Sequence, residues 1–212
     1  MGLVDMHCHL LPGIDDSEVP ADGLARVLEI YKECGFSGIA FTPHIYNPYV
    51  TTRTEILRET WEKAKALAEE KHLRAYLGSE LFIGAQTSIK SIPIAGRYAL
   101  AEFPTTLPMS GWFERLGSLV SQGMIPLVAH VERYTWLTVD SADFRRIKDL
   151  GCLIQVNVGG VLDGTALPYL QADVVDVMAT DNHGRDDKTP TQLVAQVAKW
   201  PNVVSRMEAL GL

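Results

Sequence analysis

Seven short runs of apolar, β-forming residues recur along the chain, and helical patterns separate most of them. Several of the runs are continuously apolar, which is typical of strands buried on both faces of a parallel sheet. The alternation predicts an α/β fold built as a β/α barrel of seven strand–helix units, with an open doubly wound sheet as the alternative. The predicted strands are 3–7, 38–42, 74–77, 98–101, 125–129, 153–156 and 175–180.

Helices are predicted between most of these strands. Residues 21–34 carry apolar side chains at helical spacing and are followed by Gly35, a plausible C-terminal stop. Residues 52–71 begin with Thr-Arg-Thr-Glu, which fits a capping box on Thr52. The other predicted helices are 111–122, 141–150 and 191–200.

Length and composition limit the classes of protein that fit. A chain of 212 residues suits a single domain, 1–212. The net charge of −7 argues against a nucleic-acid-binding surface, and no apolar run approaches the roughly 18 residues of a membrane helix. The chain shows no secretory signal, and its three cysteines suggest no disulfide framework, so a cytoplasmic location is expected.

Histidines and carboxylates stand at the carboxyl ends of six of the seven predicted strands. In a β/α barrel those ends meet at one face, where active sites lie. Asp16 follows the first strand in a loop and is expected to lean over the same face, while Asp15 is the better turn cap. The candidate metal ligands are therefore His7, His9, Asp16, His44, Glu80, Glu102, His130, Asp181 and His183.

The spacing of these residues has a physical reason. Residues i and i+2 of a strand point to the same side, so His7 and His9 can reach one ion, and Asp181 and His183 repeat the pattern. Imidazole and carboxylate ligands without thiolate suit Mn, Fe or Zn. Nine ligands are too many for one ion, so we expect two or three divalent ions, which together activate water for hydrolysis.

A phosphoryl substrate would need cationic side chains near the metals. Arg133 lies three residues beyond His130, and Arg185 and Lys188 follow His183, so these three are the candidate phosphate-binding residues. For Arg185 and Lys188 a surface role is an equal alternative. A thiolate phosphatase is excluded, because no cysteine is followed by an arginine six positions later.

The motifs resemble those of the PHP (polymerase and histidinol phosphatase) family, in particular its bacterial protein-tyrosine phosphatases of capsule and exopolysaccharide synthesis. The matching stretches are DMHCHLLPGIDD at 5–16, TPH at 42–44, GSE at 78–80, AEFP at 101–104, HVERY at 130–134 and TDNH at 180–183. The resemblance implies a distorted seven-stranded, TIM-like barrel, three metal ions on the nine ligands, and phosphate binding by Arg133. It also implies phosphotyrosine substrates on a tyrosine kinase that controls polysaccharide export.

This chain departs from the family pattern at three places. Val131 stands where the family usually has proline, and Ser17 stands where it usually has glycine. After the last histidine the family tends to place arginine just before proline, whereas here Arg185 and Lys188 are the two alternatives for that role. We take Arg133, Asp16 and His44 as candidate catalytic residues and manganese as the preferred metal.

Three other functions remain open from the sequence: a small-molecule phosphomonoesterase such as a histidinol phosphatase, an amidohydrolase, and a non-catalytic, metal-stabilised regulatory module. The aromatic residues after His44 and His130 are expected to pack onto the barrel rather than to form the rim of a substrate pocket; they are Tyr46, Tyr49, Tyr134 and Trp136. Asn157 is expected to bond the backbone or a group behind the ligands. The oligomeric state is left open.

Overall fold

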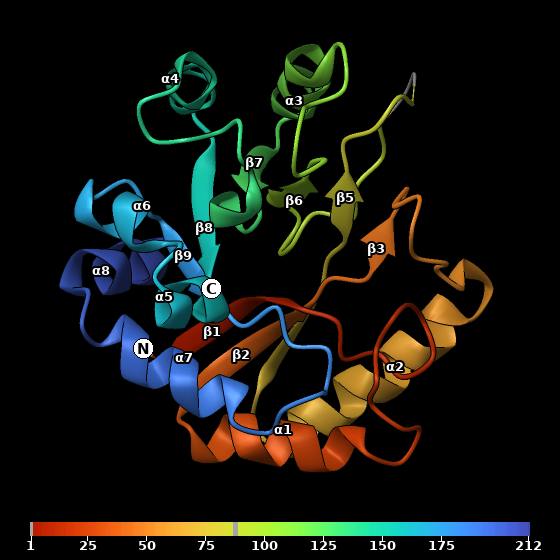
Figure 1. Cartoon of the computed structure of the whole chain (residues 1–212). Coiled ribbons are helices and arrows are strands. Elements are labelled where there is room, and N and C mark those ends of the chain that lie inside the picture. The colour runs from red at the N-terminus through yellow and green to blue at the C-terminus, as the bar shows by residue number, and fades with distance from the viewer. Residues whose placement is uncertain (1, 87–88) are drawn as a thin grey trace.

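Parallel strands form the centre of the molecule, and helices surround them (Figure 1). The computed structural model describes residues 2–86 and 89–212. The strands are β1 (Leu3–Cys8), β2 (Phe36–Phe41), β3 (His44–Ile45), β4 (Arg74–Leu77), β5 (Glu80–Phe82), β6 (Tyr98–Glu102), β7 (Ile125–Val128), β8 (Leu153–Asn157) and β9 (Val177–Ala179).

The helices occupy the segments between the strands, and α7 and α8 follow the last strand. They are α1 (Leu24–Glu33), α2 (Thr54–Glu70), α3 (Trp112–Ser121), the short 3-10 helix η1 (Val131–Arg133), α4 (Ala142–Asp149), α5 (Val158–Asp163), α6 (Leu167–Gln171), α7 (Thr189–Val197) and α8 (Pro201–Ala209). Within residues 2–86 and 89–212, no helix combines the length and the apolar character that a bilayer span requires.

The strands form two sheets, with the orders β1-β2-β4 and β3-β5-β6-β7-β8-β9. Every pairing between them is parallel, and neighbours follow the order of the chain. The mixed α/β fold with parallel strands is therefore confirmed. The closed barrel of seven strands is not confirmed, because the described residues form nine strands in two sheets. The alternative, an open doubly wound sheet, would reverse the strand order at one point, and neither sheet does so.

The division into two sheets has a local cause. β2 and β3 are separated by Thr42 and Pro43, and β4 and β5 by Gly78 and Ser79. Pro43 has no N–H and cannot donate to a neighbouring strand, although its carbonyl accepts from the Glu80 N–H at 3.0 Å. The pairing between the two neighbouring segments is thus interrupted at the same height, between β2 and β3 in one and between β4 and β5 in the other. Seven of the nine strands overlap the seven predicted strands, whereas β3 and β5 lie just beyond the predicted strands 38–42 and 74–77 and continue the segments of β2 and β4.

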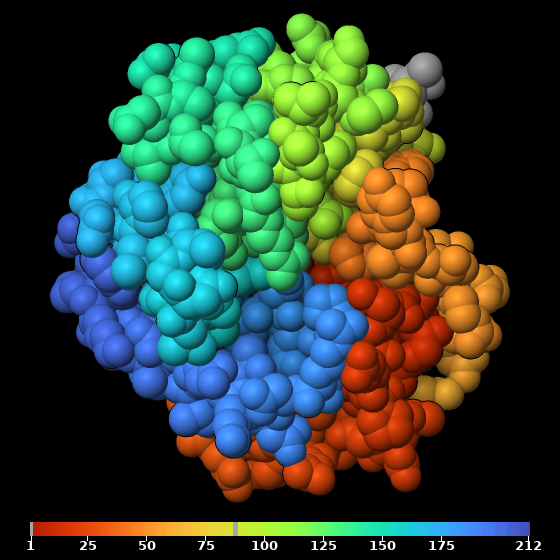
Figure 2. Space-filling model, in the orientation of Figure 1, coloured from red at the N-terminus to blue at the C-terminus, as the bar shows by residue number. Residues whose placement is uncertain are grey.

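The first and last strands lie next to each other. Cys8 forms an isolated parallel bridge with Asn182. The His9 N–H donates to the Asn182 carbonyl at 2.8 Å, and the Asp181 N–H donates to the His7 carbonyl at 2.9 Å. On the surface, the red segment that follows β1 contacts the blue segment that follows β9 (Figure 2). Segments from the two ends of the chain therefore share one edge of the fold.

Helix boundaries show where local signals succeed and fail. Gly35 follows α1 with a φ of 85°, as its role as a stop requires. The predicted capping box is wrong, because α2 begins at Thr54 after Arg53, without a side-chain cap. The Thr52 hydroxyl instead donates to the His44 carbonyl at 2.6 Å. The predicted helix 191–200 is α7, which begins at Thr189, and the prediction missed the short helices α5 and α6 as well as α8.

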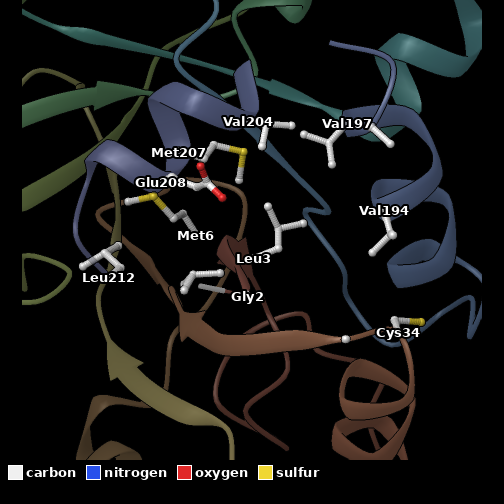
Figure 3. A pocket seen from close by; sticks show the side chains of 13 residues that line it. Gly2, Leu3, Met6, Cys34, Val194, Val197, Val204, Met207, Glu208 and Leu212 are labelled. Atoms are coloured by element: carbon white, nitrogen blue, oxygen red, sulfur yellow. The ribbon is translucent and has the colours of Figure 1, made fainter. Parts of the chain in front are cut away.

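An apolar cavity of about 230 Å³ lies at the amino-terminal end of β1, where α7 and α8 approach it (Figure 3). Leu3, Met6, Val197 and Met207 are among its lining residues, and Glu208 is its one charged lining group in the described chain. It lies at the end of β1 opposite to His9. The chemically active side chains gather at the other end of the strands.

Candidate metal centre

The structure brings together all nine side chains that the sequence singled out as metal ligands. Four of them lie within β1, β3, β5 and β6, and the other five lie in the segments that follow β1, β7 and β9. They form four overlapping groups in which one ligand atom per residue lies within 4.8 Å of every other. The groups are His9, Asp16, His44 and His183; His7, His130 and Asp181; His7, His9 and Glu80; and His44, Glu80 and Glu102.

Glu80 lies at the centre of the cluster and is 1 % exposed. Its Oε1 is 2.8 Å from His130 Nε2 and 3.4 Å from His7 Nε2. Its Oε2 is 2.9 Å from His44 Nδ1 and 3.2 Å from His9 Nε2. Burial raises the pKa of Glu80, but the surrounding histidines, above all His7, outweigh burial and hold it well below its usual value. One carboxylate thus reaches four imidazoles, the geometry expected of a bridging ligand.

One carboxylate oxygen of Asp181 faces the cluster, and the other is bound by side chains outside the cluster. Its Oδ1 is 3.3 Å from His7 Nε2 and 3.5 Å from His9 Nε2. Its Oδ2 accepts from Arg133 Nη2 at 2.7 Å and from Asn157 Nδ2 at 2.8 Å. Burial opposes ionisation of Asp181, but His7 and Arg133 more than offset it and lower the pKa of the carboxyl.

Asp16 lies at the opening of the cluster. Its Oδ1 is 3.6 Å from His44 Nε2, and its Oδ2 is 3.4 Å from His183 Nε2. Oδ1 is buried and has no hydrogen-bond partner among the described residues. A buried carboxylate oxygen without a donor is costly, so this oxygen fits a cation better than an empty space.

Glu102 adds a second carboxylate next to Glu80. Burial, followed by the charge of Glu80, raises the pKa of Glu102 to about 8. Its oxygens are 3.8 Å from His44 Nδ1 and 3.9 Å from His130 Nε2, and Asn47 donates to Oε2 at 2.9 Å. Two adjacent buried carboxylates cannot both ionise cheaply unless positive charge lies between them. The donor set therefore fits divalent cations.

The three candidate phosphate-binding residues lie in different surroundings. Arg133 is half exposed, and its guanidinium reaches the edge of the cluster at Asp181. Arg185 lines a groove of about 280 Å³ together with Arg133 and His183, while its Nε donates to exposed Glu18 at 2.7 Å. Lys188 is exposed at the start of α7 and is not among the groove's lining residues.

Comparison with known proteins gives the family. The family model described as "Capsular polysaccharide synthesis, CpsB/CapC" matches residues 3–200. The chain belongs to the CpsB/CapC family. The resemblance seen in the sequence is thereby confirmed.

Named members of the CpsB/CapC family are similar over most of their length. The tyrosine-protein phosphatase CpsB of Streptococcus agalactiae is 25% identical over 209 residues, covering 89% of this chain and 86% of that protein. CpsB of Streptococcus pneumoniae is 27% identical, with the same shares covered.

Two solved structures share the fold. One, described as YwqE from Bacillus subtilis and CpsB from Streptococcus pneumoniae, "unique metal-dependent tyrosine phosphatases", has a TM-score of 0.76 at 21% identity and covers 93% of this chain and 87% of that one. A histidinol phosphate phosphatase from Lactococcus lactis, complexed with zinc, L-histidinol and phosphate, has a TM-score of 0.57 at 15% identity and covers 93% of each chain.

Two residues of this CpsB/CapC member have roles that the sequence did not reveal. Asp15, predicted as a turn cap, does accept from the Ser17 N–H at 3.3 Å. Its other oxygen accepts from His9 Nδ1 at 2.7 Å and from the His44 N–H at 3.2 Å, so it also orients His9. Gln155 has no counterpart in the sequence prediction. Its signal was its i, i+2 spacing from Asn157 within an otherwise apolar strand.

The aromatic residues near the cluster divide into two kinds. Tyr134 is buried, its hydroxyl is 3.2 Å from His130 Nδ1, and Trp136 packs against it, as the packing interpretation predicted. Tyr46 and Tyr49 are 47% and 88% exposed, so for them that interpretation is wrong. The loop after β3 projects them away from the core.

Proposed function

We propose that this chain is a metal-dependent protein-tyrosine phosphatase of polysaccharide synthesis. The observation that carries the proposal is the cluster around Glu80, in which one buried carboxylate reaches four histidines from different strands. The names of the CpsB relatives supply the substrate class. The proposal takes residues 1–212 as one cytoplasmic domain, with its seven strand segments arranged as a distorted barrel.

The nine clustered side chains would hold two or three divalent ions, with manganese preferred and iron or zinc also suited to the donors. When bound, such ions supply an activated water and neutralise charge on the phosphoryl oxygens. His7, His130 and Asp181 would serve one position, and His44, Glu80 and Glu102 another. Asp16 and His183 lie at the opening, where a further ion would complete the set.

Side chains of this chain also bind and orient the substrate in the proposal. Arg133 lies at the edge of the cluster with its guanidinium half exposed, so it can bind phosphoryl oxygens while it remains in contact with Asp181. Arg185 shares the adjoining groove and is the better second candidate than Lys188. Asp16 and His44, which lie 3.6 Å apart at the opening of the cluster, are the residues proposed to pass a proton to the tyrosine oxygen, although phenolate leaves readily without a dedicated acid. The partner proposed is a phosphorylated tyrosine kinase.

The test is phosphate release from a phosphotyrosine peptide by Mn²⁺-loaded protein, before and after a chelator. Glu80→Gln keeps the size of the side chain but removes the central charge, so it should lower metal content and phosphate release together. Arg58→Lys, on the exposed face of α2, is the matched control and should behave as wild type. Release that persists in chelated protein would overturn the proposal.

A second candidate function is hydrolysis of a small phosphomonoester. The fold shared with the Lactococcus lactis histidinol phosphate phosphatase favours it. Comparing kcat/KM for histidinol phosphate and for the phosphotyrosine peptide on the same metal-loaded preparation separates the two. A higher value for histidinol phosphate would favour the second function.

A further inference from the structure

Of the seven predicted strand segments, only the one that forms β8 ends without a candidate ligand. Two buried amide side chains lie on β8 instead. Gln155 is fully buried, and Asn157 is 4% exposed. A buried amide costs free energy unless its donors and acceptors are paired. The two residues are spaced i, i+2 and therefore face the same side of the strand. Their hydrogen bonds show what that side contacts.

The bonds form one continuous path across the cluster. Gln155 Oε1 accepts from the His130 N–H at 2.8 Å and lies 3.2 Å from His7 Nδ1. Gln155 Nε2 donates to Asn157 Oδ1 at 2.7 Å. Asn157 Nδ2 then donates to Asp181 Oδ2 at 2.8 Å. The two amides thus connect His7 of β1 with His130 after β7 and with Asp181 after β9.

The direction of each bond follows from the backbone. The His130 N–H can only donate, so it fixes the oxygen of the Gln155 amide on its own side. The hydrogen between Gln155 Oε1 and His7 must therefore come from His7 Nδ1, which leaves Nε2 without hydrogen and its lone pair free to bind a metal. His7 Nε2 is the atom that faces Glu80 and Asp181, at 3.4 and 3.3 Å.

The same amides form hydrogen bonds with two residues whose backbone is strained. His130 and Asp181 have φ values of 33° and 50°, in the left-handed region that side chains other than glycine rarely adopt. Gln155 accepts the N–H of the first, and Asn157 binds the carboxylate of the second. Strained residues persist only where their surroundings over-determine them.

We propose that Gln155 and Asn157 form a positioning relay, which holds His7 in the tautomer that binds metal through Nε2 and holds Asp181 with Oδ1 toward the ions. The relay rests on the proposed function only in that the cluster binds metal. Neither amide contacts substrate, so both are positioning residues. Removing partners that orient metal ligands typically weakens metal binding about 10- to 100-fold.

The first test is Zn²⁺ and Mn²⁺ affinity, measured by chelator competition without any substrate. Gln155→Met removes the amide's three contacts, with His7, His130 and Asn157, at similar volume and should weaken binding about 10- to 100-fold. Asn157→Ala should weaken it about 10-fold. Gln122→Met, at an exposed position after α3, is the matched control. Affinities of both variants within about threefold of the control would overturn the relay.

The second test uses wild-type protein and does not depend on a variant that folds. Nitrogen NMR of the Zn²⁺-loaded protein reports which ring nitrogen of His7 carries hydrogen. The relay requires hydrogen on Nδ1 and metal on Nε2; the reverse would overturn it. Wild-type protein that binds no divalent ion would overturn the proposed function as well, whereas normal binding with unchanged variants would overturn the relay alone.

Discussion

Asp15 provides the sharpest test of how the cluster is held. Its carboxylate is fully buried, and one oxygen accepts from both His9 Nδ1 at 2.7 Å and the His44 N–H at 3.2 Å. Burial opposes ionisation of Asp15, but the hydrogen bonds and charges of His9 and His44 together outweigh burial and lower the pKa of the carboxyl, so the group is ionised. A charged acceptor on Nδ1 orients the ring and makes Nε2 a stronger ligand.

Asp15→Ala should weaken metal binding about 10- to 100-fold. That range equals about 1.4–2.7 kcal/mol, since each tenfold step is about 1.4 kcal/mol. It agrees with the roughly 1.5–3 kcal/mol of a hydrogen bond to a charged group. Asp15→Asn keeps a neutral acceptor, and because charge-assisted bonds are about twice as strong as neutral ones, it should lose about half as much free energy.

The measurement is Mn²⁺ affinity by competition with a fluorescent chelator, beside the melting temperature of each metal-free protein. Asp22→Asn, an exposed carboxylate just before α1, is the control and should bind as wild type does. If Asp15→Ala binds Mn²⁺ as tightly as the control, Asp15 is only a turn cap and the reasoning is refuted.

Three further predictions follow from single side chains. Arg133→Ala should lower kcat/KM for a phosphotyrosine peptide about 100-fold even in protein kept saturated with Mn²⁺; a loss that disappears at saturating Mn²⁺ would show that Arg133 acts only by holding Asp181. Burial raises the pKa of Glu132 from 4.5 to about 7, so its contribution to folding stability should fall as pH rises between those values in metal-free protein; denaturant unfolding of Glu132→Gln should lack that slope. Burial raises the pKa of the Cys152 thiol to about 12, so a thiol reagent at pH 8 should label it only after unfolding, unlike partly exposed Cys34.

Much of the strand layout was predictable because it rests on local composition. β4 has the predicted bounds, and the strand-end rule pointed to eight of the nine clustered residues, while Asp16 was placed from the loop after β1. β3 was not predictable, because two residues carry no periodicity and the strand exists only through its pairing with β5. The failed capping box has a similar cause: the Thr52 hydroxyl is taken by the carbonyl of His44, a residue of β3.

The roles of neighbouring polar residues were harder to separate. Asp15 and Asp16 are adjacent carboxylates in one loop, and only the fold determines that one turns behind His9 while the other faces His183. Gln155 shows the opposite difficulty. Its signal was present in the sequence, but an amide in an apolar strand has no assignable partner until the fold brings His7 of β1 and His130 after β7 into contact with it.

The adjacency of β1 and β9 has a consequence for biosynthesis. The His7 carbonyl accepts from the Thr180 hydroxyl, 173 positions later in the chain. At about 5–20 residues per second, a ribosome needs roughly 10–35 s between these two residues. During that interval the emerging chain exposes half-assembled groups of histidines and acids that the last strand has not yet closed. Under the proposed function, loading with metal ions would therefore be a late event, and a nascent chain stalled before residue 181 should exchange bound metal far faster than the released protein.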